Sequence, residues 1–385
     1  MSSQPSAADF RVVIAGGGVA AMEAALALAE LAGQLTAVTV VAPNAELVNR
    51  PMAVREPFAY PHAERHPLAP IVRAAGAELL ADKLERVDPE RRAVHTKGGS
   101  ELAYDALVLA LGARIEPRYE HAITIDDRSL EETLQGLIQD VEGGYVKSLG
   151  FVVPAPMAWL LPLYEIALMI AGRAYDMNLE LACTLVTPED TPLAVFGSGA
   201  SDAVAERLAR ARVQTICSSY AEVPGSGKII VNPGERELQV DRVIALPQLS
   251  GPALSGVPAN EHGFLRTSPN CELLELERVY AAGDCVEFPV KHGGLASQMA
   301  DAAAESIAAL AGAPVEPHPF EPEIMGMLLT GGKPLYLHAK ITGGHGFSSE
   351  ASDEPLWSPP SKIASKYLAP FLDAQQRSAG AAGSP

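Results

Sequence analysis

A glycine-rich turn close to the N-terminus constrains this chain more than any other feature. An apolar run, Val12–Ile14, leads into Gly16-Gly17-Gly18-Val19-Ala20-Ala21, and a helical pattern follows from Met22 to Leu31. The first glycine permits a tight strand-to-helix turn, the third lets a pyrophosphate approach the backbone, and Ala21 keeps helix and strand close. A tight turn without a ligand is the alternative. The strand–turn–helix context favours a dinucleotide-binding site.

The segment after this helix completes a β-α-β unit. A second apolar run, Thr36–Val41, gives the minimal dinucleotide half-site. Such sites usually carry an acidic residue at the end of the second strand, where it holds ribose hydroxyls. Here Ala42, Pro43 and Asn44 occupy that stretch. Asn44 or Glu46 is the candidate substitute, and ribose recognition is the weakest part of the pattern.

Charge and composition exclude several classes of protein. The net charge is −18 and no block of Lys or Arg occurs, so nucleic acid is not an expected partner. Residues 1–9 lack the basic and apolar regions of a secretory signal. The most apolar window, 157–171, is too short to cross a bilayer, and we expect a buried helix there.

The four cysteines show neither CxxC nor metal-ligand spacing, so a disulfide framework or zinc site is not expected. We expect Cys183 and Cys217 in apolar strands, Cys271 in a surface loop, and Cys285 beside Asp284. A reducing cytoplasm fits this usage. We also expect no metal site at His292 or His345, which lack companions at ligand spacing.

A second β-α-β pattern follows at 149–153, 162–174 and 180–186. Its phosphate turn is abnormal, because no glycine occurs between Pro154 and Glu165. Pro154 and Pro156 also remove backbone donors, and Trp159 adds bulk where a pyrophosphate would lie. We therefore predict that NAD(P)H binds weakly.

The later part of the chain adds a carboxylate and a small-residue helix. A buried strand ends at Gly283-Asp284, at the edge of a parallel sheet where ligands bind. An alanine-rich helix then runs from Gly293-Gly294 to about Leu310. Beyond it we expect strands near 333–341, a Gly/Ser loop at 342–355, an amphipathic helix at 362–372 and a disordered tail.

In this order the motifs resemble the two-dinucleotide-domain flavoproteins of the pyridine nucleotide-disulfide oxidoreductase superfamily. The matching segments are GxGxxA at 16–21, YDxLVxAxG at 104–112 and VYAxGD at 279–284. Segments 289–298 and 331–336 are most similar to the type II NADH dehydrogenase and sulfide:quinone oxidoreductase branch. The resemblance implies an α/β fold of two Rossmann-like doubly wound domains, the second inserted into the first. The implied FAD domain spans 1–115 and 263–318, the NAD(P)-binding-like domain 116–262, and a C-terminal region 319–385.

The resemblance also implies roles for single residues. Arg50 matches an arginine that meets the flavin pyrophosphate, Arg55 falls where relatives place a lysine near the flavin, and Asp284 would hold the ribityl–phosphate part of FAD. Leu111 departs from the usual threonine. Lys291 precedes a helix expected to face the flavin, and Glu165 resembles the Glu of the second dinucleotide motif, so these two are the catalytic candidates. The predicted cofactor-binding residues are Gly16, Gly17, Gly18, Ala20, Ala21, Pro43, Asn44, Arg50, Arg55, Leu84, Ala110, Gly112, Gly283, Asp284 and Gly294.

We predict an FAD-dependent oxidoreductase that passes electrons from a donor, with NAD(P)H as a candidate, to a quinone or other small-molecule acceptor. A sulfide:quinone oxidoreductase-like enzyme is one alternative, although the loop 154–161 lacks the cysteine of that branch. A flavin-bound scaffold or sensor is the other. The C-terminal helix could pack on its own domain, pair two copies, or touch the inner face of the membrane peripherally.

Overall fold

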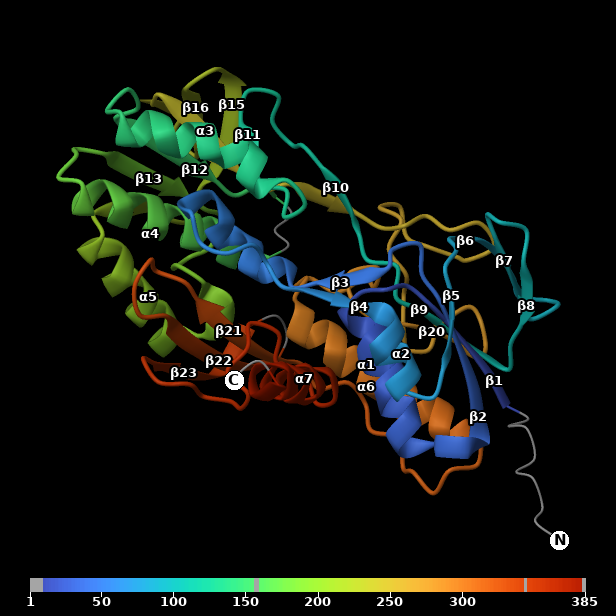
Figure 1. The fold of residues 1–385 in the computed structure, drawn as a ribbon. Coiled ribbons are helices and arrows are strands. Elements are labelled where there is room, and N and C mark those ends of the chain that lie inside the picture. Colours follow the sequence, from blue (N-terminus) through green and yellow to red (C-terminus); the bar gives the residue numbers. More distant parts are fainter. Residues whose placement is uncertain (1–9, 156–158, 343–344, 383–385) are drawn as a thin grey trace, which may run out of the picture.

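The computed structural model describes residues 10–155, 159–342 and 345–382. Its first sheet is five-stranded and parallel, in the order β20-β9-β1-β2-β5. Four strands come from the N-terminal part of the chain and one, β20, arrives much later (Figure 1). The strands are β1 (Phe10–Ala15), β2 (Thr36–Val41), β5 (Glu78–Leu80), β9 (Ala106–Leu109) and β20 (Val279–Ala281).

Helices α1 (Val19–Leu31) and α6 (Gly293–Leu310) lie side by side on this sheet. Their facing surfaces are rich in alanine, including the buried Ala24, Ala27, Ala300 and Ala304. Small side chains let the two helix axes approach closely, and that packing holds the chain's late segment against its first helix. Helix α2 (Leu68–Ala74) packs beside α1. The 3₁₀ turn η1 (Gly33–Leu35) connects α1 to β2.

Smaller elements extend this first domain. A three-stranded antiparallel sheet is formed by β6 (Leu84–Asp88), β7 (Ala93–Thr96) and β8 (Glu101–Ala103). Strands β3 (Glu46–Val48) and β4 (Arg65–Pro67) pair with each other, and the chain between them contains the 3₁₀ helix η2 (Arg50–Phe58). Helix η2 reaches the inserted domain, where it contacts α3 (Figure 1).

The inserted domain has its own parallel sheet, ordered β11-β18-β12-β13-β14. Its two linkers pair with each other, since β10 (Arg114–Glu116) and β19 (Gln248–Ser250) form an antiparallel ribbon. The other elements are β11 (Ile123–Thr124), α3 (Leu130–Glu142), β12 (Ser148–Val152), α4 (Leu161–Asp176), β13 (Ala182–Val186), η3 (Ala194–Phe196), α5 (Ser198–Arg210), β14 (Val213–Ile216), β18 (Arg242–Ala245), and the antiparallel β15 (Tyr220–Gly225), β16 (Lys228–Asn232) and β17 (Arg236–Gln239).

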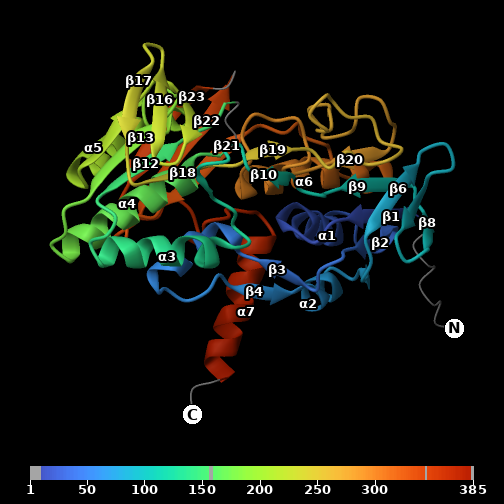
Figure 2. The same ribbon diagram turned by 90° about the horizontal axis from the view of Figure 1, so that it is seen from above.

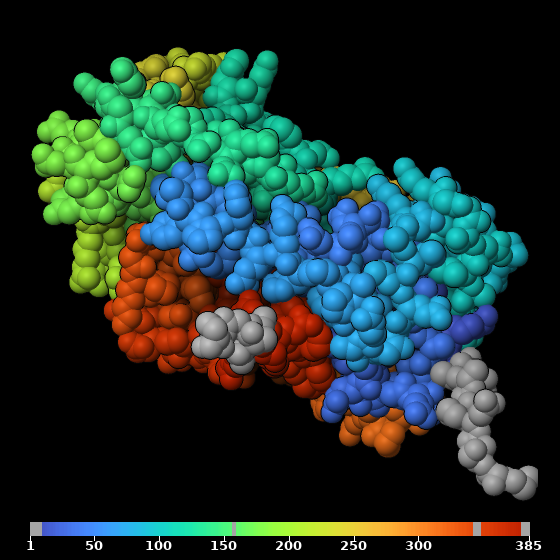
Figure 3. Space-filling model, viewed as in Figure 1, coloured from blue at the N-terminus to red at the C-terminus, as the bar shows by residue number. Residues whose placement is uncertain are grey.

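The C-terminal region is a three-stranded antiparallel sheet followed by a helix: β21 (Glu323–Leu328), β22 (Leu335–Thr342), β23 (His345–Ser352) and α7 (Leu368–Ala382). On the face shown in Figure 3 this region lies below the inserted domain and beside the first domain. The far end of α7 projects from the body of the molecule (Figure 2).

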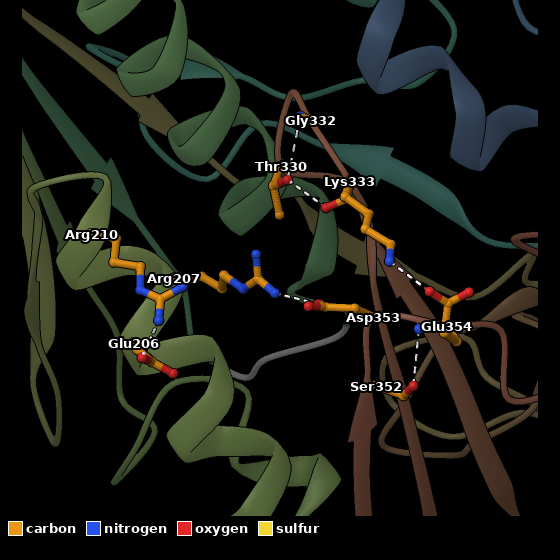
Figure 4. A network of polar contacts seen from close by, with 9 residues as sticks. All are labelled: Glu206, Arg207, Arg210, Thr330, Gly332, Lys333, Ser352, Asp353 and Glu354. Atoms are coloured by element: carbon orange, nitrogen blue, oxygen red, sulfur yellow. Dashed lines mark hydrogen bonds and ion pairs between the residues drawn. The ribbon is translucent and has the colours of Figure 1, made fainter.

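An ion pair joins the C-terminal sheet to the inserted domain, because Arg207 of α5 pairs with Asp353, directly after β23 (Figure 4). Within the C-terminal region, Lys333 Nζ lies 2.6 Å from Glu354 Oε1. The α5 N-terminus is also covered, because the Ala200 amide donates to Ser349 Oγ at 2.7 Å. The sheet therefore contacts α5 both at its N-terminus and at Arg207.

The doubly wound fold class is confirmed, but two expectations for the C-terminal region are wrong. The expected Gly/Ser loop contains strand β23, whose hydrogen-bonded partner is β22. The final helix begins at Leu368 rather than near Lys362 and continues to Ala382. Of the described part of the chain, no helix is both long and apolar enough to cross a membrane.

Candidate functional site

The glycine-rich turn has one open side. A Cβ on Gly16, where φ is +140°, would lie 2.2 Å from the Ala110 carbonyl oxygen, so the turn packs tightly on the end of β9. A Cβ on Gly17 would meet Leu68 at 2.9 Å. No atom lies within 4 Å of the Cβ direction of Gly18, the N-cap of α1. Free helix amides beside open space form the geometry that a pyrophosphate needs.

The Gly-Asp turn after β20 meets the same helix. Gly283, at φ +83°, has room for a Cβ only against Ala20 and Ala296, at 3.4 and 3.3 Å. Asp284 is partly exposed beside them. Burial raises the pKa of the Asp284 carboxyl, and the positive charge of Lys291 opposes that shift. A carboxylate next to the dinucleotide turn is a suitable acceptor for ligand hydroxyls.

Charged groups of both domains converge next to Asp284. Arg50, the first residue of η2, lies 3.3 Å from Asp127 of the inserted domain, measured between Nη1 and Oδ1. Burial raises the pKa of Asp127, and Arg50 lowers it. Asp127 and Arg50 also act on the pKa of Asp284. An arginine at this place can receive a pyrophosphate, with its guanidinium currently directed to Asp127.

Lys291 lies at the edge of this charge cluster. Its Nζ donates to the Val286 carbonyl oxygen and lies 4.0 Å from the centroid of the Phe264 ring. Burial lowers the pKa of Lys291, while Asp284 raises it. A Cβ on Gly293 would meet Ile363 at 3.1 Å, and a Cβ on Gly294 would meet His292 at 2.9 Å.

The other catalytic candidate, Glu165, is wholly buried and forms an internal ion pair with Lys362. Lys362 Nζ lies 2.6 Å from its carboxylate, and the Leu329 amide donates to Oε1 at 2.8 Å. Lys362 also donates to the Pro51 carbonyl oxygen at 2.9 Å. Burial raises the pKa of Glu165 and lowers that of Lys362, and each charge opposes the shift of the other. The sequence carried no signal for Lys362, whose surroundings depend on three distant segments.

A cavity of about 360 Å³ lies beside the dinucleotide turn, between η2, the β3–β4 pair, the segment 359–365 and α7. Its lining is largely apolar, and Val19, the residue after Gly18, forms part of it. Two polar groups on its wall, Asn49 Oδ1 and Arg55 Nε, have no hydrogen-bond partner among the described residues. Unpaired buried polar atoms beside an apolar space indicate a site for a ligand. The apolar lining includes Leu47, Met52, Met327, Ile363, Leu368 and Leu372.

The remaining predicted cofactor residues divide into near and distant groups. Ala21 is buried in α1, and Ala110 touches the Gly16 turn, with Gly112 at φ +69° two residues on. Pro43 and Asn44 are exposed at the end of β2, and Glu46 pairs with Arg65 at 3.6 Å. Leu84, at the start of β6, is buried in the core of the first domain.

The second dinucleotide turn has no glycine, and the structure describes only part of it. Pro154 follows β12, Pro156 lies outside the described residues, and α4 begins only at Leu161. The Trp159 ring packs against His292, with 4.6 Å between centroids. Burial lowers the pKa of His292 to about 4, so this imidazole is neutral.

Glu189 is a residue that our sequence analysis missed. It follows β13, at the position where dinucleotide folds place the ribose-binding acid. The Tyr164 hydroxyl donates to it at 2.6 Å, Thr187 Oγ1 at 3.0 Å and the Ala194 amide at 3.0 Å. Its acceptor oxygens are thus engaged internally. An acidic residue three positions after a second strand was the signal available in the sequence.

Burial disfavours the thiolate form of the four cysteines. Burial raises the pKa of Cys183 and Cys271 to about 12 and that of Cys285 to about 11. The expectation of a surface position for Cys271 is wrong, and Cys217 is half-buried rather than core. All four thiols are free.

One group of possible metal ligands occurs among the described residues. Ligand atoms of Glu56, His62 and Glu131 lie within 4.8 Å of one another. The His62 side chain is 72% exposed, and its Nδ1 lies 3.6 Å from Glu131.

Comparison with known proteins agrees with this geometry. The family model for pyridine nucleotide-disulphide oxidoreductase matches residues 10–135. The predicted resemblance to this superfamily is confirmed. The chain is 25% identical to a sulfide-quinone reductase of Aquifex aeolicus over 63% of this chain and 59% of that protein, less than two thirds of its length. It is 24% identical to an NADH dehydrogenase-like protein of Mycobacterium tuberculosis, over 71% and 72%.

The whole fold also has a solved counterpart. The crystal structure of sulfide:quinone oxidoreductase from Aquifex aeolicus superposes with a TM-score of 0.77 at 19% identity, covering 96% of this chain and 90% of that one. The similarity in fold therefore extends beyond the segment that the family model matches.

Proposed function

We propose that this protein is an FAD-dependent oxidoreductase that delivers electrons to a small apolar acceptor such as a quinone. The observation that carries the proposal is that the dinucleotide turn adjoins the apolar cavity. No atom lies within 4 Å of the Cβ direction of Gly18, and the next residue, Val19, lines the cavity. A cofactor held by the turn would reach the wall of a cavity suited to an apolar ring.

The residues present fit FAD. The free amides at the start of α1 and the guanidinium of Arg50 would hold the pyrophosphate, and Asp284 would accept a hydroxyl of the ribityl chain. Lys291 would add positive charge beside the flavin. The flavin supplies the electron transfer, and the protein supplies binding, orientation and electrostatics.

NAD(P)H is a weak donor in this proposal. The second turn contains Pro154 but no glycine, and α4 begins late, at Leu161. Glu189 already accepts a hydrogen bond from the Tyr164 hydroxyl. We expect NADH to reduce the flavin only at concentrations far above the micromolar range. Saturation at micromolar NADH would overturn this part of the proposal.

The test is anaerobic mixing of the purified protein with NADH, NADPH and sulfide in turn, followed by decylubiquinone. We expect a yellow protein whose flavin absorbance bleaches with one donor and returns with the quinone. A colourless protein that does not take up added FAD would overturn the cofactor assignment. A yellow protein that no donor bleaches would favour the scaffold or sensor.

Likeness to the sulfide-quinone reductase favours sulfide oxidation as the second candidate. A cysteine-based route needs a reactive thiolate, whereas Cys271 and Cys285 are buried with raised pKa values. Replacing all four cysteines with serine separates the two candidates. We expect flavin reduction by the true donor to continue, and loss of turnover with FAD still bound would favour the sulfide enzyme.

A further inference from the structure

The start of the C-terminal helix is attached to the first helix of the protein by one buried carboxylate. Glu23 of α1 is fully buried. Its Oε1 accepts the amides of Lys366 and Tyr367 at 2.7 and 2.8 Å, and its Oε2 accepts the amide of Leu368 at 2.6 Å. Ser365 Oγ accepts the next amide, that of Ala369, at 2.7 Å. All the donors of this turn are thereby satisfied by two side chains.

A second carboxyl group lies against Glu23 from the neighbouring helix. Asp301 of α6 has a buried Oδ1 without a hydrogen-bond partner among the described residues. Burial, and then the adjacent Glu23, raise the pKa of Asp301 to about 8. The other charged groups that act on this pair are Glu305 of α6 and Lys366. Burial also raises the pKa of Glu23, whereas the three amides that donate to it lower that pKa and favour its ionised form.

Beyond its first turn, α7 has little attachment. Leu368 and Ala369 are buried, while residues 374–378 are exposed and the helix projects outward (Figure 2). Its middle, including Leu372, forms a wall of the cavity. At the far side of that cavity, Gln376 donates to Glu64 at 2.8 Å in an exposed position. The position of this wall therefore depends on how its first turn is held.

We propose that Glu23 and Asp301 form a proton-dependent clasp that positions the C-terminal helix as a wall of the acceptor cavity. Glu23 is a positioning residue, since it acts through α7. The clasp closes when Asp301 is protonated and loosens when both carboxyl groups are ionised side by side. Only its effect on the acceptor rests on the proposed function.

The variant Glu23→Gln tests the clasp directly, with Glu30→Gln as the matched control on an exposed position of the same helix. The amide of Gln places a donor where the Leu368 amide needs an acceptor. We expect hydrogen exchange of the 366–368 amides to accelerate about tenfold or more in Glu23→Gln, and not in the control. Equal exchange in the two variants would overturn the proposal.

A second variant, Asp301→Asn, leaves the Glu23 carboxylate in place and serves if Glu23→Gln does not fold. After correction for intrinsic exchange rates, protection of residues 366–368 should fall between pH 7 and pH 9 in the parent protein and stay constant in Asp301→Asn. The same pH response in both would overturn the proton dependence.

The acceptor is tested with decylubiquinone and, for comparison, with ferricyanide, a small acceptor that does not need the cavity. In Glu23→Gln we expect KM for decylubiquinone to rise severalfold while kcat with ferricyanide is unchanged. If the parent protein does not reduce decylubiquinone, the proposed function fails, whereas the exchange experiment still decides the clasp. An unchanged KM together with accelerated exchange would overturn the role of the clasp at the cavity.

Discussion

At the scale of single residues, two glycines of one turn have different structural requirements. Gly16 has a positive φ, +140°, and no room for a Cβ, whereas Gly18 has an extended backbone, at φ −92°, and open space beside it. The first is required by the packing of the protein itself. The second is free to change unless a ligand occupies the space.

This contrast predicts opposite effects of two substitutions. Gly16→Ala should lower the free energy of unfolding by on the order of 1–3 kcal/mol, because of backbone strain and the contact with Ala110. Gly18→Val should leave the thermal midpoint of the FAD-free protein almost unchanged and abolish FAD binding. Calorimetry and FAD fluorescence measure the two effects. Full FAD occupancy in Gly18→Val would contradict the site.

Lys291 provides a prediction about redox potential. A positive charge near a reduced flavin stabilises its negative charge, so Lys291→Met should lower the flavin midpoint potential while FAD stays bound. About 1.4 kcal/mol corresponds to about 30 mV for a two-electron couple, and a drop of tens of millivolts is expected. Spectroelectrochemical titration beside Lys333→Met, which changes an exposed lysine, measures it. Equal potentials in both variants would remove Lys291 from the site.

At the scale of elements, the helix pair α1–α6 contains a carboxyl group whose titration opposes folding. The pKa of Asp301 is raised from 3.8 to about 8, so the folded state holds a proton that the unfolded state releases. Stability must therefore fall as pH rises from about 4 to about 8, and this contribution is constant above that range.

The variant Asp301→Asn lacks the carboxyl group and should not lose stability in this way as the pH rises. Its stability relative to the parent protein should increase through that pH window and reach on the order of a few kcal/mol at pH 8. Chemical unfolding at pH 5, 7 and 8.5 provides the comparison. A difference that does not change with pH would show that Asp301 is ionised throughout.

The sequence predicts those elements whose signals are local. Helix α6 and the strands β1, β2, β12, β13 and β20 follow from their apolar or alanine-rich runs, and the tight turn at Gly16 follows from its spacing. Strand β23 was missed because its Gly/Ser composition is typical of loops, while its partner β22 supplies the pairing. The start of α7 was misplaced because Glu23, far away in the chain, caps it. The cavity wall and Lys362 likewise depend on distant segments.

At the scale of the whole molecule, one buried ion pair joins three regions. Glu165 belongs to the inserted domain, Lys362 to the C-terminal segment and Pro51 to the first domain. Lys362→Met should destabilise the protein by about 3–5 kcal/mol, because it leaves a buried carboxylate without its partner. The double variant Glu165→Gln/Lys362→Met should recover most of this loss, since Gln still accepts the Leu329 amide. Urea unfolding of the four proteins measures the coupling, and additive losses would contradict it.

The late arrival of β20 has a consequence for synthesis on the ribosome. All strands of the inserted parallel sheet lie between residues 123 and 245, whereas the first sheet lacks its edge strand, and α1 lacks its partner α6, until residues 279–310 have emerged. Domains fold as units during translation. We therefore expect the parallel sheet of the inserted domain to form while the domain that surrounds it in sequence is still incomplete, so that the first part of the nascent chain to emerge becomes native only after a later part.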